Sequence, residues 1–78
     1  MLDSEFGKVK LHVEEMLIQK GFSKNKFAQK AEMQRTQLNK YCNGDIVLLD
    51  INVLGRMCTI LGCEIGDILE FVPPEKHD

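Results

Sequence analysis

The chain has 78 residues, an apolar fraction of 44% and a formal net charge of −2, which together bound it to one small globular domain. No apolar run approaches the roughly 20 residues of a membrane-spanning helix, and the first residues, MLDSEFGK, lack the pattern of a secretion signal. We therefore expect a cytoplasmic protein with no membrane partner.

The cysteines do not form a disulfide or zinc framework, because they are odd in number and have no paired CxxC spacing. We expect Cys42, Cys58 and Cys63 to be reduced thiols. His12 and His77 lie far from any ligand-like cysteine pair, so we expect no metal and no cofactor. The sequence also lacks a set of nucleophile, base and acid and a phosphate-binding loop, and we expect no enzymatic activity.

The charge is unevenly distributed along the chain. Residues 1–44 carry eight Lys or Arg against five Asp or Glu, whereas residues 45–78 carry two against seven. Six of the cations fall between Lys20 and Lys40, where Glu32 is the one acidic residue. A local basic segment on an acidic chain points to an anionic partner more clearly than the total charge does.

Apolar periodicity predicts helices throughout, and no strand pattern is apparent. Val9, Val13, Met16 and Leu17, for example, form one helical stripe. Ser23 and Asp50 are suitable N-caps, Gly residues follow several helix ends, and Pro73-Pro74 prevents continuation at the end. The five helices are expected over residues 8–20, 24–31, 34–42, 51–61 and 65–71.

The predicted fold class is therefore all-α, a compact bundle of five helices. We expect one domain over residues 8–72, between a flexible N-terminus of residues 1–7 and a flexible tail of residues 73–78.

The second and third predicted helices touch the core along narrow edges only. Phe27, Ala31 and Met33 anchor the first of them and the turn, and Leu38 and Tyr41 anchor the other. The remaining face of residues 34–42 consists almost entirely of side chains that can donate or accept hydrogen bonds. A helix of this kind fits the major groove of DNA.

These residues carry a family resemblance. The spacing of Phe27-Ala28, Ala31, Met33, Leu38, Tyr41 and Asn43-Gly44 resembles the helix-turn-helix of the lambda-repressor-like (Cro/Xre) family. The run LGCEIGDILEFVP resembles the last two helices of short stand-alone Xre-type regulators, so that the likeness extends over residues 9–73. It implies a sequence-specific DNA-binding transcriptional regulator of the repressor type, with its recognition helix in the major groove.

The sequence departs from the family pattern in two places. The turn, where the family usually has Gly, contains Glu32, and a left-handed backbone there would cost about 1 kcal/mol or more. Gln34 stands where a Ser or Thr often caps the recognition helix, which weakens the cap by up to about 1 kcal/mol. Gly55, in the middle of the fourth predicted helix, has a similar cost.

The resemblance also implies roles for individual residues. Lys24 would contact a phosphate, Arg35 and Thr36 would point at base edges, and Lys40 would contact a base or a phosphate. Asn43 would approach the DNA backbone. Further contacts are expected from Gln34, Gln37 and Asn39.

Two alternatives to a sequence-specific regulator remain open at this stage. One is a helix-turn-helix module that binds another protein, such as an antitoxin or a phage accessory factor. The other is an architectural DNA binder of weak specificity. We also expect a weak homodimer on double-stranded DNA, formed through an apolar surface of the last helix and tail, namely Ile65, Ile68, Leu69, Phe71 and Val72.

Overall fold

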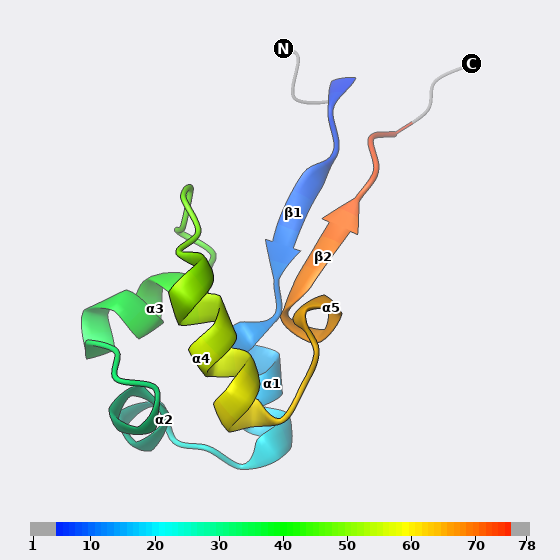
Figure 1. The fold of residues 1–78 in the computed structure, drawn as a ribbon. Coiled ribbons are helices and arrows are strands. Elements are labelled where there is room, and N and C mark those ends of the chain that lie inside the picture. Colours follow the sequence, from blue (N-terminus) through cyan, green and yellow to red (C-terminus); the bar gives the residue numbers. More distant parts are fainter. Residues whose placement is uncertain (1–4, 76–78) are drawn as a thin grey trace.

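The computed structural model describes residues 5–75, which fold into five helices and one two-stranded antiparallel sheet (Figure 1). No helix within this range is long and apolar enough to cross a membrane. The outermost parts of the expected flexible ends, residues 1–4 and 76–78, lie outside the described residues. In chain order the elements are β1 (Lys8–Leu11), α1 (Val13–Lys20), α2 (Lys24–Lys30), α3 (Arg35–Asn43), α4 (Ile51–Leu61), α5 (Ile65–Ile68) and β2 (Leu69–Val72).

All five helices contribute to one hydrophobic core. Leu17 of α1, Phe27 of α2, Leu38 of α3, Met57 of α4 and Ile68 of α5 are each at most 2% exposed. Burial of such side chains is the main force that holds short helices together, because helices of this length are marginal in isolation. The core therefore fixes where α2 and α3 lie.

Local signals set most of the helix boundaries. The Ser23 hydroxyl accepts a hydrogen bond from the Lys26 amide at 3.2 Å, and the Asp50 carboxylate accepts one from the Asn52 amide at 2.9 Å. Both bonds satisfy amide groups that have no partner inside their helix. α1 and α4 end at Gly21 and Gly62, whose φ angles of 76° and 65° place them in the left-handed region.

The expectation of an all-α fold is only partly correct, because each end of the domain contains a strand. β1 and β2 pair antiparallel, with Val9 opposite Phe71 and Leu11 opposite Leu69. The first predicted helix thus begins at Val13 and not at residue 8, and the fifth ends at Ile68 and not at residue 71. In Figure 1 this β-ribbon projects away from the helices.

The apolar residues of β1 fit the period of a helix as well as that of a strand, so the sequence of this segment alone does not separate the two. Lys8-Val9-Lys10-Leu11 alternates polar and apolar residues, as a strand does, but Val9 also extends the apolar stripe of α1. The segment forms a strand and not a helix because β2, from the far end of the chain, pairs with it residue by residue. In the ribbon Val9 is 61% exposed, whereas Leu11 packs against the core.

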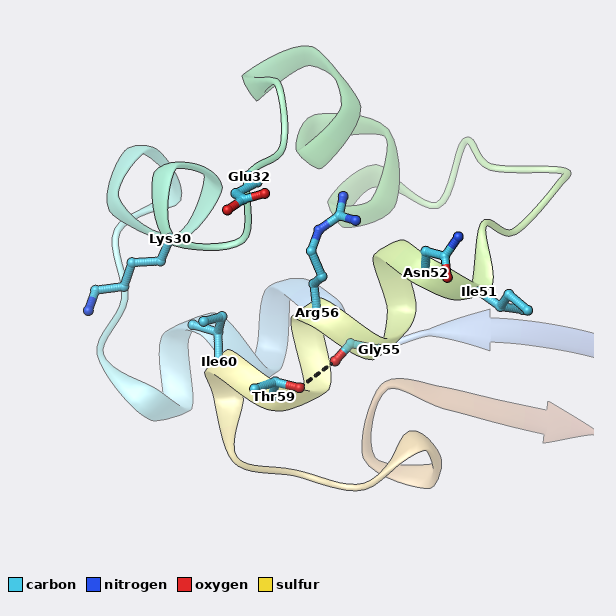
Figure 2. A pocket seen from close by; sticks show the side chains of 8 residues that line it. All are labelled: Lys30, Glu32, Ile51, Asn52, Gly55, Arg56, Thr59 and Ile60. Carbon is cyan, nitrogen blue, oxygen red and sulfur yellow. Dashed lines mark hydrogen bonds between the residues drawn. The ribbon is translucent and has the colours of Figure 1, made fainter.

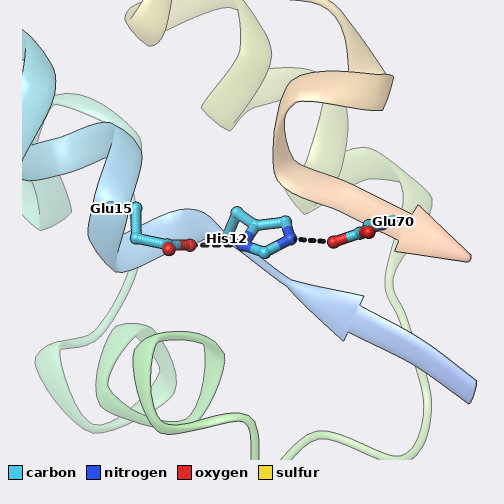
Figure 3. Close-up of polar contacts among 3 residues, drawn as sticks. All are labelled: His12, Glu15 and Glu70. Carbon is cyan, nitrogen blue, oxygen red and sulfur yellow. Dashed lines mark hydrogen bonds and ion pairs between the residues drawn. The ribbon is translucent and has the colours of Figure 1, made fainter. Parts of the chain in front are cut away.

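His12 joins the ribbon to the helices. Its backbone amide donates to the Ile68 carbonyl at 2.8 Å. Its imidazole lies between two carboxylates, with Nε2 2.6 Å from Glu70 Oε1 of β2 and Nδ1 bonded to Glu15 of α1 (Figure 3). The carboxylates of Glu70 and Glu15 raise the pKa of His12 above its ordinary value, since both ring nitrogens can donate only when the ring is protonated.

Candidate nucleic-acid interface

α2 and α3 form a helix-turn-helix whose buried edge is the predicted one. Phe27, Ala31 and Leu38 are fully buried, and Tyr41 is 1% exposed. Ala28 is also buried, as expected for a small residue where two helices approach closely. α3 is consequently held along one side and leaves its other side to solvent.

The turn between the two helices contains the expected strain and a support that the sequence did not reveal. Glu32 has a φ of 55°, in the left-handed region, which is unfavourable for a residue with a Cβ. Arg56 reaches from α4 toward the turn (Figure 2) and its Nε donates to the Ala31 carbonyl at 2.7 Å. This bond satisfies a carbonyl at the end of α2 and places a positive charge at the negative end of the helix dipole.

The predicted contact residues belong to α3, its N-cap and the first turn of α2. Gln34 is the N-cap of α3 and makes no side-chain capping bond, as its poor capping propensity suggests. The exposed side chains are those of Gln34, Arg35, Thr36, Lys40 and Asn43, and the partly exposed ones are those of Lys24, Gln37 and Asn39. All eight predicted residues are thus at least partly accessible to a ligand, and their role as contacts stays a prediction.

Arg35 is held from two sides. Its Nε donates to Asn39 Oδ1, one turn along α3, at 3.2 Å, and its Nη1 donates to Asn25 Oδ1 on α2. Asn25 is absent from the predicted contact set, because its role depends on where α2 crosses α3. The one feature of the sequence that could have indicated Asn25 as a contact is its position in the first turn of α2, next to Lys24.

Lys24 forms a weak ion pair with Glu14 of α1. Its Nζ lies 3.8 Å from Glu14 Oε1 of α1, and both side chains are partly exposed. An ion pair at this distance and exposure is weak, so a phosphate can compete with Glu14 for the ammonium group.

A comparison with protein families decides what this helix-turn-helix is. Residues 12–74 match the family model of the Cro/C1-type helix-turn-helix DNA-binding domain. The chain belongs to this family. The crystal structure of the transcriptional regulator VanUg (Form II) has a similar fold, with a TM-score of 0.69, 23% sequence identity, and coverage of 94% of this chain and 96% of that chain. No curated protein sequence matches the chain.

The loop that follows α3 in this Cro/C1-type domain is acidic and apolar. Asp45 and Asp50 lie near its two ends, and Val47 between them is 93% exposed. Carboxylates repel phosphates, so this loop is poorly suited to follow the DNA backbone. The basic part of the interface stops at the end of α3.

The surface of the Cro/C1-type domain also contains an open groove of about 420 Å³ along α4, beside the turn (Figure 2). Its polar groups, including Lys30, Glu32 and Thr59, face solvent or bond to the domain itself, as Thr59 Oγ1 does to the Gly55 carbonyl at 2.8 Å.

The thiol and carboxylate groups of the domain suggest no catalytic or metal site. Burial raises the pKa of the Cys42 thiol, which therefore stays protonated at neutral pH. Within residues 5–75, no group of three His, Cys, Asp or Glu residues is arranged to hold a metal ion.

Proposed function

We propose that the protein is a sequence-specific transcriptional regulator of the Xre type that represses transcription by binding operator DNA in the cytoplasm. The single observation that supports this most is the surface of α3, where exposed hydrogen-bonding side chains surround a guanidinium group already held in place by Asn25 and Asn39. A positioned arginine suits base recognition, because arginine binds O6 and N7 of guanine through two parallel bonds.

In this proposal the contacts divide into two classes. Arg35 and Thr36, at the start of α3, contact base edges, with Gln34, Gln37 and Asn39 beside them. Phosphate contacts come from Lys24 and Asn43, and Lys40 contacts a base or a phosphate. Base contacts give sequence preference, whereas phosphate contacts give affinity that depends on salt.

The proposal includes a weak two-fold dimer on DNA. One recognition helix covers only a few base pairs, and dimers of helix-turn-helix proteins bind half-sites about one DNA turn apart. Of the apolar residues expected to form the dimer surface, Ile68 is fully buried and Leu69 and Val72 are half-buried. Ile65 and Phe71, which are 49% and 66% exposed, are left for a partner.

The test is a selection from duplexes with a randomised segment, at a stated salt concentration. We expect one preferred sequence with two related half-sites and an affinity well above that for unrelated duplexes. Uniform weak binding would indicate an architectural DNA binder. No binding to any duplex, by a protein shown to be folded, would contradict the proposed function and favour a module that binds another protein.

A further inference from the structure

Two of the three cysteines lie where α4 ends and the chain turns toward α5 (Figure 1). Cys58 is in the last turn of α4, and Cys63 directly follows Gly62, at which the helix ends. Both side chains are partly exposed, and both pack against the edge of the hydrophobic core. Each thiol is therefore accessible to a small reagent in solution, although the fold holds it in place.

The backbone of this turn holds the two cysteines close together. The Cys63 amide donates to the Cys58 carbonyl at 3.1 Å, and Gly62, with a φ of 65°, reverses the chain between them. A helix that ends in this way frequently brings the side chains before and after the glycine into contact. The path from the Cys58 Cα through this hydrogen bond to the Cys63 Cα is about 7 Å when drawn straight, and the bends at the carbonyl oxygen and the amide nitrogen shorten the direct distance.

This separation suits a disulfide bond, whose Cα atoms are usually about 4.4–6.8 Å apart. The thiols themselves are neighbours: burial raises the pKa of the Cys63 thiol, and the Cys58 thiol raises that pKa further through its charge and through a hydrogen bond between the two side chains. Among the described residues, the groups that shift the pKa of Cys42 on α3 include no thiol. Cys58 and Cys63 therefore form a pair to which Cys42 does not belong.

We propose that Cys58 and Cys63 form a reversible disulfide bond in the folded protein, by exchange with a low-molecular-weight disulfide such as glutathione disulfide. One thiol of the pair, once deprotonated, attacks a sulfur of glutathione disulfide, which gives a mixed disulfide and releases one glutathione thiolate. The other thiol loses its proton and attacks the protein sulfur of the mixed disulfide, which releases the second thiolate. The two released thiolates take up the two protons, so that two protein thiols are oxidised and one glutathione disulfide is reduced to two glutathiones.

The surroundings of the pair favour a bond that forms slowly and persists once formed. A thiol with a raised pKa, as Cys63 has, is rarely ionised at neutral pH and therefore attacks slowly. It is also a poor leaving group when the disulfide is reduced. In a reducing compartment we expect both thiols to be reduced, as the sequence indicates, and to be oxidised only when small disulfides accumulate.

The fold has already closed the loop that the disulfide would close. The backbone bond between Cys63 and Cys58 joins its ends in the reduced protein, so that the folded chain loses little further freedom on oxidation, whereas the unfolded chain loses more. Folding and disulfide formation should therefore favour each other to the same extent. The inference is independent of the proposed function, because neither cysteine belongs to the predicted DNA contacts.

The first test is thiol exchange of the full chain in oxygen-free glutathione buffers of graded redox ratio, followed by acid quenching, alkylation of the remaining thiols and mass spectrometry. Trypsin cleaves after Lys40 and Arg56, so Cys42 is in the peptide 41–56 and the pair is in the peptide 57–76. In oxidising buffer we expect the peptide 57–76 to lose two hydrogen atoms and to take up no alkyl group. Excess reduced glutathione should return it to the dithiol.

Serine variants assign the bond. Cys42→Ser is the matched control and should form the disulfide at the same glutathione ratio as the wild type. Cys58→Ser and Cys63→Ser should stop at the mixed disulfide with glutathione, because no second thiol is present to displace it. Thermal melting shows whether each variant is folded.

A comparison of the folded and the unfolded chain tests the role of the turn, with Cys42→Ser as the protein so that only the pair reacts. The equilibrium constant for disulfide formation with glutathione should be at least about tenfold smaller in concentrated urea than in buffer. By the same linkage, the oxidised protein should melt at a higher temperature than the reduced one.

Three results would overturn the inference. One is a folded wild-type protein whose peptide 57–76 carries only alkyl groups or glutathione at every redox ratio. The second is an equilibrium constant in urea that equals or exceeds the constant in buffer. The third is an oxidised protein that melts below the reduced one, since the turn would then oppose the bond.

Discussion

Arg35 and Asn39 lie one turn apart on α3, and the guanidinium Nε donates to the amide oxygen at 3.2 Å. With the second bond, from Nη1 to Asn25 of α2, the arginine is fixed to both helices of the helix-turn-helix before DNA arrives. Such preorganisation lowers the side-chain entropy that is lost on binding.

Arg35→Ala should weaken binding to the preferred site by about 1–3 kcal/mol and relax the preference at one base pair. Asn25→Ala should lower the same preference less, and should have little further effect when Arg35 is already alanine, because it acts through Arg35. Asn52→Ala, on α4, is the matched control and should leave affinity unchanged. Equal losses on all sequences would make Arg35 a phosphate contact.

Lys24→Ala should weaken binding to all sequences alike, because phosphate contacts carry no sequence information. The slope of log affinity against log salt concentration should shrink by about one unit. Lys20→Ala, at the end of α1 near Cys63 and outside the predicted contact set, should keep both the affinity and the slope. An unchanged slope in Lys24→Ala would remove Lys24 from the contacts.

Glu32→Gly should raise the free energy of unfolding by about 1 kcal/mol, because glycine adopts the left-handed region without a steric cost. Glu32 has a φ of 55°. Glu32→Ala keeps the Cβ and should gain nothing, which separates backbone strain from the loss of charge. Urea denaturation of the three proteins makes the comparison, and an equal gain in both variants would assign the effect to charge.

Sequence patterns predicted well those elements whose boundaries are set by neighbouring residues. The fourth helix was predicted over residues 51–61 and α4 has these bounds, because Asp50 caps its start and Gly62 its end. The exposed face of α3 followed from the positions of Leu38 and Tyr41, which a helix must bury together.

Features that depend on distant segments were not predictable. β1 exists because β2, about 60 residues away, pairs with it, and the sequence of β1 alone also fits a helix. The bond between Arg35 and Asn25, and that between Arg56 and the Ala31 carbonyl, depend on how two helices cross. No spacing rule within one helix contains that information.

Gly55→Ala should stabilise the protein by about 0.5–1 kcal/mol, because glycine in a helix interior loses more backbone entropy on folding than alanine does. A Cβ at this position would have no atom within 4 Å apart from its own helix and chain neighbours, so no clash opposes the gain. Thermal melting should show a rise of several degrees, with DNA affinity unchanged; a lower melting temperature would refute the prediction.

Stability should depend on pH through His12. Because Glu70 and Glu15 raise its pKa above 6.5 in the folded protein, folding favours the protonated ring. The resulting stabilisation is complete below about pH 6.5 and is lost as the pH rises through the folded-state pKa. The difference in free energy of unfolding between wild type and His12→Gln should therefore be larger at pH 5.5 than at pH 8.5.

Urea denaturation at both pH values measures this difference, and comparison with the variant removes the contributions of other titrating groups. An NMR titration gives the pKa directly: the midpoint of the His12 ring signal, assigned by its loss in His12→Gln, should lie above 6.5 and should fall in Glu70→Gln. Glu70 contributes the larger share of the shift, so Glu15→Gln should lower the midpoint less. A wild-type midpoint at or below 6.5, or a stability difference that does not change with pH, would mean that the ring is not held by the two carboxylates in solution.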